Sequence, residues 1–141
     1  MKDLLNNINV KRVLSPSAGP SDNTAQVGQI IDRQGFESVT YLIATGSLAD
    51  ADATFAVTID EGDQANLSDA SAVAAADLIG TTALASFVFS DDDKCFKLGY
   101  KGNKRYTRLT ITPSANASAA AMCVMAVLGH PAVAPTVNPP A

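Results

Sequence analysis

Large apolar residues occupy every second position in several segments of this chain. The pattern is clearest over residues 39–43 and 55–59, and it recurs where Leu109 and Ile111 alternate with polar residues. Successive side chains of a β-strand point to opposite faces, so this period predicts strands with one buried face. Since the 3.6-residue period of an amphipathic helix is scarce here, we expect an all-β protein.

Turn-forming residues divide the chain into about eight such segments. We expect strands near residues 8–15, 23–31, 36–46, 53–61, 82–90, 94–99, 104–112 and 119–128. Short strands joined by polar turns favour a single-domain β-sandwich of the jelly-roll type, with an open barrel as the alternative. One short helix is predicted near residues 69–78, between a cap at Ser68 or Asp69 and a stop at Gly80.

The C-terminal part of the chain contains an apolar run and then a proline-rich tail. The run, residues 121–128, predicts a strand covered on both faces, or else a short buried helix. The twelve residues from His130 include four prolines, which exclude a helix or a central strand. Pro113 is expected to end its strand for the same reason. We therefore divide the chain into a β-sandwich domain at residues 1–129 and an extended tail at residues 130–141, which either has no role or lies along a neighbouring subunit.

The residues that could perform chemistry are scattered. Cys95 and Cys123 have 27 residues between them, which fits no zinc or redox spacing, so free thiols are expected and a disulfide stays open. The single histidine, His130, precedes a proline and has no evident catalytic partners. The acidic turns at 50–52 and 91–93 lack the pattern of a calcium loop. We predict no catalytic residue, no metal and no cofactor, and we expect that the chain is not an enzyme.

Most of the positive charge is concentrated in one part of an acidic chain. Six of the ten Lys and Arg residues lie between Lys94 and Arg108. Gly102 and Asn103 separate two strand-like runs there, which predicts a β-hairpin. We expect the basic residues of this hairpin to lie in or beside an interface with an acidic protein surface. They are Lys101, Lys104, Arg105 and Arg108.

Two other interpretations of these basic residues stay open. They form a solvated face, or they bind nucleic acid, since Phe96, Tyr100 and Tyr106 interleave with them as aromatic residues do in single-strand binders. The net charge of −4 at pH 7 makes nucleic acid the less favoured partner. No segment has the roughly eighteen consecutive apolar residues that cross a bilayer, and the first residues lack the apolar centre of a secretory signal. We therefore expect no membrane partner.

Four segments resemble small head proteins of tailed phages. They are residues 35–46, 50–57, 78–81 and 99–113, and the likeness extends over about residues 10 to 135. The chain is similar to capsid decoration (cement) proteins, in particular those of Bordetella phages. No site residue transfers by this resemblance.

The resemblance implies a jelly-roll virion protein that is made in the host cytoplasm and binds the outside of an icosahedral head. It also implies that the protein holds neighbouring major capsid proteins together and forms a homodimer or another small homo-oligomer. The alternatives are a nucleic-acid-binding β domain and a virion adhesion or tail component.

Overall fold

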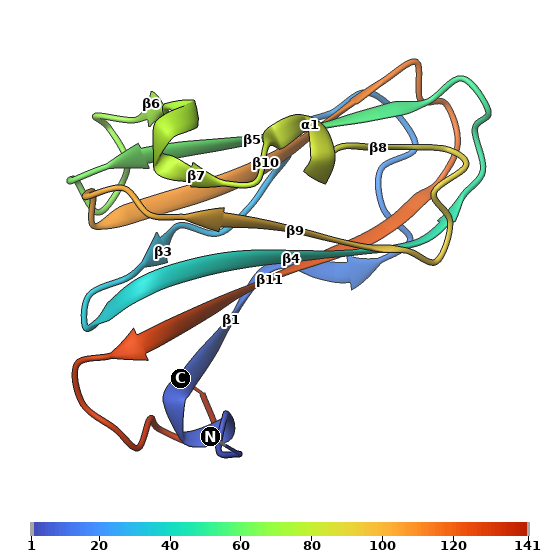
Figure 1. The fold of residues 1–141 in the computed structure, drawn as a ribbon. Helices are drawn as coiled ribbons and strands as arrows, with labels where there is room; N and C mark the ends of the chain where they lie inside the picture. The colour runs from blue at the N-terminus through green and yellow to red at the C-terminus, as the bar shows by residue number, and fades with distance from the viewer. Residues whose placement is uncertain (1, 141) are drawn as a thin grey trace.

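The computed structural model describes residues 2–140 as two antiparallel sheets packed face to face (Figure 1). Sheet A has the strand order β1 (Ile8–Ser17), β11 (Ala120–Pro131), β4 (Phe36–Leu48), β9 (Cys95–Tyr100) and β7 (Leu78–Ile79). Sheet B has the order β2 (Gln26–Val27), β10 (Tyr106–Ser114), β5 (Thr54–Gly62) and β6 (Ser71–Ala72), with β3 (Ile31–Asp32) also on β10 and β8 (Phe87–Val88) on β5. From β4 onwards the long strands β4, β5, β9, β10 and β11 alternate between the two sheets, as in a jelly roll. The predicted all-β sandwich is confirmed.

The core lies between the two sheets and is built from the alternating apolar positions. Every second residue is buried along most of β4, β5, β10 and β11. Each large side chain buried in this way contributes about 1.5–3 kcal/mol to folding. Near the β8 side, the Phe87 ring stacks between Phe55 and Phe96, with centroid distances of 4.9 and 5.6 Å. Aliphatic side chains fill most of the remaining interior.

The longer predicted strands coincide with β1, β4, β5, β9, β10 and β11, but two details differ. The segment 23–31 forms only the two short strands β2 and β3.

Pro113 does not end β10, because it pairs with Phe55 and the strand continues to Ser114. The carbonyl of Leu109 accepts from Gly28 on the side away from β5, and alternate residues share that direction. The backbone nitrogen of Pro113 therefore points away from β5. The missing N–H removes no hydrogen bond between β10 and β5.

The predicted helix at residues 69–78 is wrong. That segment contains β6, a 3-10 turn at Ala75–Asp77 and the start of β7. The α-helix, α1, is Thr82–Ala85 and lies within the segment expected to be a strand at 82–90. A helix in a protein is stabilised mainly by packing of its apolar face. The alanine side chains at 69–78 offer little area for such packing. Ser71–Ala72 pairs with the end of β5 instead. The hydroxyl of Thr81 caps α1 by accepting from the Leu84 N–H at 3.1 Å.

The predicted hairpin at Gly102 and Asn103 is also wrong, because the two strands belong to different sheets. β9 pairs with β4 in sheet A, whereas β10 pairs with β5 in sheet B, so residues 101–105 cross the end of the sandwich. Arg33 holds this crossing loop: its guanidinium donates to the carbonyls of Lys104 at 2.5 Å and Gly102 at 2.9 Å. Turn residues alone do not distinguish a hairpin from such a crossing.

The two ends of the described chain lie together beside β1 (Figure 1). A short 3-10 turn, Leu5–Asn7, precedes β1. β11 continues through His130 to Pro131, two residues into the expected tail. The tail then returns to the N-terminal turn, where the Thr136 N–H donates to the Asn6 carbonyl at 2.9 Å and the Thr136 hydroxyl to the Ile8 carbonyl at 2.6 Å. Met1 and Ala141, the outermost residues of the two expected segments, lie outside the described residues.

No helix within residues 2–140 is long and apolar enough to cross a membrane.

Candidate functional site: the outer face of sheet A

The outer faces of the two sheets have different chemistry. On sheet B, the outward residues of β5 and β10 are largely hydroxyl-bearing, as in the facing pairs Thr58–Thr110 and Thr54–Ser114. On sheet A, the run 121–128 is buried only at alternate residues. The expectation that it is covered on both faces is therefore wrong for the single chain. Its other face, which includes Met125 at 45% exposure, lies open on the outside of the sandwich.

The strand register places apolar residues in rows across this outer face. One row, which we call the Lys97 row, runs from Arg12 on β1 through Met125 and Leu42 to Lys97 on β9. A cation thus lies at each end of the row, with two apolar side chains between them. The flanking rows are Val10, Val127, Thr40, Gly99 and Ile79 on one side and Cys123, Ala44 and Cys95 on the other.

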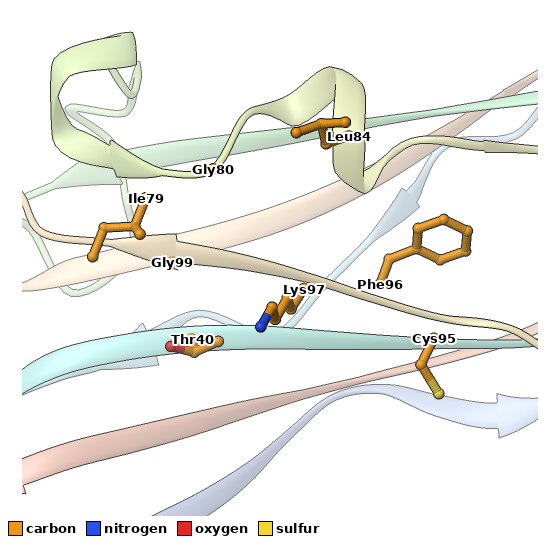
Figure 2. A pocket seen from close by; sticks show the side chains of 8 residues that line it. All are labelled: Thr40, Ile79, Gly80, Leu84, Cys95, Phe96, Lys97 and Gly99. Carbon is orange, nitrogen blue, oxygen red and sulfur yellow. The ribbon is translucent and has the colours of Figure 1, made fainter.

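Two shallow hollows meet at Lys97. One, of about 530 Å³, lies where β7 ends, between Ile79, Leu84 and the outer side of β9. The other, of about 290 Å³, lies over β4 and β11 and is bounded by Leu42, Cys123 and Met125. Figure 2 shows Ile79 from β7 and Leu84 from α1 along one side of β9, with Lys97 on the strand itself.

The hollows are open rather than enclosed, and their walls are mainly apolar. Ile79 is 61% exposed and Leu84 75% exposed. Lys97 borders both hollows.

The charges on this outer face all have the same sign. Among the outward positions of the described strands of sheet A, Arg12 and Lys97 are charged and no carboxylate occurs. Within residues 2–140 neither cation forms an ion pair; Arg12 donates to the Ser15 hydroxyl at 2.9 Å. The face therefore combines apolar side chains with uncompensated positive charge.

The four basic residues singled out from the sequence lie elsewhere, at and beside the crossing loop. Lys104 pairs with Asp63 at 2.6 Å. Arg105 donates to both carboxylate oxygens of Asp32, at 2.9 and 2.8 Å.

The other two of the four differ in their surroundings. Arg108 lies on the outer face of sheet B, 3.9 Å from Asp60. Lys101 is exposed at the start of the loop, and its backbone N–H donates to the Asp77 carbonyl. Three of the four cations thus already face carboxylates of the same chain.

These pairs shift the pKa values of the groups involved. The hydrogen bond from Arg105 lowers the pKa of Asp32, even though partial burial opposes the shift. The hydrogen bond to Asp63 raises the pKa of Lys104. Exposed pairs of this kind contribute little to stability because solvent screens the attraction. Their main effect is to neutralise the positive charge of the loop locally.

Other residues with chemical potential hold the backbone. Asp50 accepts from the Ala117 N–H at 2.7 Å, and Asp92 accepts from the Leu48 N–H at 2.9 Å. Among residues 2–140, no three His, Cys, Asp or Glu side chains come together as metal ligands would. The sequence did not reveal that the Ser38 hydroxyl lies 2.9 Å from His130 Nδ1. A triad serine bonds Nε2 while Nδ1 faces the acid, so this pair does not have the geometry of a triad.

Cys95 and Cys123 lie in one row on the outer face, on either side of Ala44. Both thiols are free. Two strand spacings separate their backbones, about 9.5 Å, which exceeds the roughly 7 Å limit for a disulfide. The open possibility of an intrachain disulfide is therefore excluded by the register.

The sequence-based prediction missed the outer face of sheet A because it selected interface residues by their clustered positive charge. It did not use the apolar residues at the outward positions of the strands. The signal was present in two places. Leu42 and Ala44 are apolar at the outward positions of β4, and the run 121–128 is apolar at both inward and outward positions.

No protein-family model matches the sequence, and no curated protein matches it. Among solved structures, the fold is similar to the crystal structure of SPBc2 prophage-derived protein YomS, with a TM-score of 0.53 and 9% identity over 88% of this chain and 94% of that one. The CBM22-1–GH10 modules of Clostridium thermocellum xylanase 10B, complexed with xylohexaose, align with a TM-score of 0.47 and 10% identity over 95% of this chain and 28% of that one. At these identities the likeness concerns the fold alone, which is a two-sheet β-sandwich.

Proposed function

We propose that this protein is a structural component of a tailed-phage head, which binds the outside of the icosahedral shell and cements neighbouring major capsid proteins. The observation that carries the proposal is the open, carboxylate-free apolar face of sheet A. Two likenesses support the phage assignment: four sequence segments resemble phage cement proteins, those of Bordetella phages included, and the fold is similar to that of a prophage-derived protein. The role requires binding and no catalysis.

An apolar face of this kind suits attachment to a large protein surface. Soluble proteins seldom leave extended apolar patches exposed, and such patches commonly mark sites of interaction. A subunit that binds only the assembled shell stabilises it by mass action. Because a head offers many equivalent sites, weak contacts by a small oligomer add up through multivalency. The oligomeric state is part of the proposal, and light scattering of the purified protein measures it.

Binding to nucleic acid, the first alternative, has less support from the geometry. Three of the four loop and β10 cations are already paired with carboxylates, so phosphates would have to displace them. Arg105 also lies over the Tyr106 ring, 5.0 Å from its centroid. The guanidinium therefore covers an aromatic face on which a nucleic-acid base would otherwise stack. Phosphate binding would weaken steeply as salt rises, so a salt titration separates this alternative.

The direct test adds purified protein to heads assembled without it and measures occupancy by sedimentation and electron microscopy. We expect the wild-type protein to cover the shell. Met125→Asp places a charge on the outer face of sheet A and is expected to abolish attachment. Thr112→Asp makes a matched change on the outer face of sheet B, where Thr112 faces Ala56, and is expected to bind normally. Both positions are exposed, so the melting temperatures should stay close to that of the wild type.

Two results would contradict the proposal. Bare shells at saturating protein would exclude the cement role. Protein found only at the tail would favour the second alternative, an adhesion or tail component.

A further inference from the structure

We infer that Lys97 and the two hollows beside it receive a segment of the major capsid protein that carries a carboxylate between apolar side chains. The inference rests on the proposed function and specifies the contact on the partner. It concerns a surface that the basic residues of the crossing loop do not share, because those residues lie at the end of the sandwich and on sheet B.

The geometry provides two apolar recesses with one cation between them. Ile79 and Leu84 bound the first recess, and Leu42 and Met125 bound the second. Lys97 borders both. A segment lying across β9 would place one apolar side chain on each side of the Lys97 ammonium. The aliphatic stem of a lysine covers apolar surface while its ammonium stays accessible, so Lys97 can take part in both kinds of contact.

The charge of the face determines which kind of residue must lie between these apolar anchors. A cation that becomes buried without a partner loses its hydration and strongly weakens the contact. Because the outward residues of sheet A include no carboxylate, the partner must provide the one that pairs with Lys97. Arg12 lies at the other end of the Lys97 row, three strand spacings or about 14 Å away, and is positioned for a second carboxylate at the rim.

The same charges argue against a second copy of this chain as the occupant. If two copies packed through this face, each would contribute Arg12 and Lys97 and neither would contribute a carboxylate. Both pairs of cations would then lose water without compensation. Opposite charges across an interface also guide the encounter of two proteins and fix their register. A subunit that must bind at one defined site of a shell requires both effects.

The test compares equal charge changes on the two candidate surfaces. Lys97→Glu and Arg12→Glu change the outer face of sheet A, and Lys101→Glu makes the same change on the exposed crossing loop. We expect Lys97→Glu to weaken attachment to the heads at least about tenfold, since attraction becomes repulsion. Arg12→Glu should have a smaller effect because it lies at the rim, and Lys101→Glu should bind like the wild type. If Lys97→Glu does not fold, Lys97→Gln takes its place, with a smaller loss expected.

A second readout uses the thiol between the hollows. Cys95 borders both hollows and is exposed, so it should react rapidly with a maleimide in the free protein and slowly on the head. Cys123→Ala removes the other thiol from the measurement. Thr112→Cys, added to a Cys95→Ala and Cys123→Ala background, provides the control on sheet B and should react equally in both states.

Each outcome decides between the alternatives. If the wild-type protein leaves the heads bare, the proposed function is wrong and this inference falls with it. If the wild type binds and Lys97→Glu binds equally well, or Cys95 stays reactive on the head, only this inference is overturned. Loss of binding by Lys101→Glu alone would assign attachment to the crossing loop. Protection of Cys95 in the free protein, together with self-association, would identify a second copy as the occupant.

Discussion

The hydroxyl oxygens of Tyr41 and Thr107 lie 2.7 Å apart in the core and join the two sheets by a hydrogen bond. Tyr41 belongs to β4 in sheet A and Thr107 to β10 in sheet B, and both are fully buried. Burial raises the pKa of Tyr41, so the phenol stays neutral over the range in which the protein is handled. The pair is a polar link between the two sheets within a mainly apolar core.

Removing either half of this link should destabilise the fold. Tyr41→Phe and Thr107→Val each leave one buried hydroxyl without its partner, at an expected cost of about 1–3 kcal/mol. The double variant should lose less than the sum, because no unpaired hydroxyl remains. Urea unfolding of the four proteins measures these free energies. Strictly additive losses would show that the bond between the two residues contributes nothing of its own.

Arg33 should set the order of the crossing loop. Its guanidinium donates to two loop carbonyls and lies 5.6 Å from the centroid of the Tyr100 ring. A lysine cannot reproduce the forked geometry, so Arg33→Lys should speed amide hydrogen exchange at residues 101–105. Exchange in β11 should not change. Equal protection of the loop in both proteins would mean that Tyr100, whose hydroxyl accepts from the Lys104 N–H and donates to Glu61, holds the loop alone.

Acid should weaken the fold through Asp32. Its pKa is lowered in the folded protein, chiefly by the hydrogen bond from Arg105, whereas the pKa of an unfolded Asp is about 3.9. The stabilisation is therefore present above that value and is lost as the pH falls through the lower, folded pKa. Asp32→Asn should make the fall in unfolding free energy below about pH 4 shallower.

The matched variant for this pH dependence is Arg105→Gln. It removes the donor and should flatten the same part of the profile. A slope that neither substitution alters would place the acid sensitivity in other carboxylates, such as Asp91, whose pKa is lowered chiefly by Lys94.

The two cysteines should stay reduced under mild oxidation of the monomer. Their positions on β9 and β11, with β4 between them, keep them too far apart to bond. In the native protein Cys95, which is exposed, should be alkylated before the half-buried Cys123. Mass spectrometry after partial alkylation gives the order. An intrachain disulfide in the folded monomer would contradict the register of sheet A.

The sequence was sufficient for the architecture where local pattern and burial agree. Residues 39–43 and 55–59 alternate because one face of each strand enters the core, and no distant contact is needed to recognise this. The helix expected at 69–78 failed because alanine favours a helix locally but offers little surface to pack. The α-helix formed instead at Thr82–Ala85, where the Thr81 hydroxyl caps it.

The candidate site was harder to predict because it depends on pairings between distant segments. The basic residues near 101–108 are adjacent in the sequence, but their partners Asp32, Asp60 and Asp63 are identified only by the fold. Conversely, Arg12 and Lys97 are 85 positions apart in the sequence and meet in one row only through β11 and β4. Clustered Lys and Arg residues in a sequence therefore show which segment carries the positive charge. The fold determines which of these residues pair with carboxylates and which remain unpaired.

The hydroxyl-rich outer face of sheet B has a consequence for a decorated particle. A subunit whose sheet A lies on the shell turns the threonines and serines of β5 and β10 towards the surrounding medium. Hydroxyl groups both donate and accept hydrogen bonds and carry no charge at ordinary pH. On β5 and β10 the charged residues Arg108 and Asp60 face each other and are neutral as a pair. Each bound subunit would thus cover a patch of shell with the hydrated, hydroxyl-rich face of sheet B, so that the hydroxyl groups of this face, rather than the capsid protein beneath, meet the surroundings there.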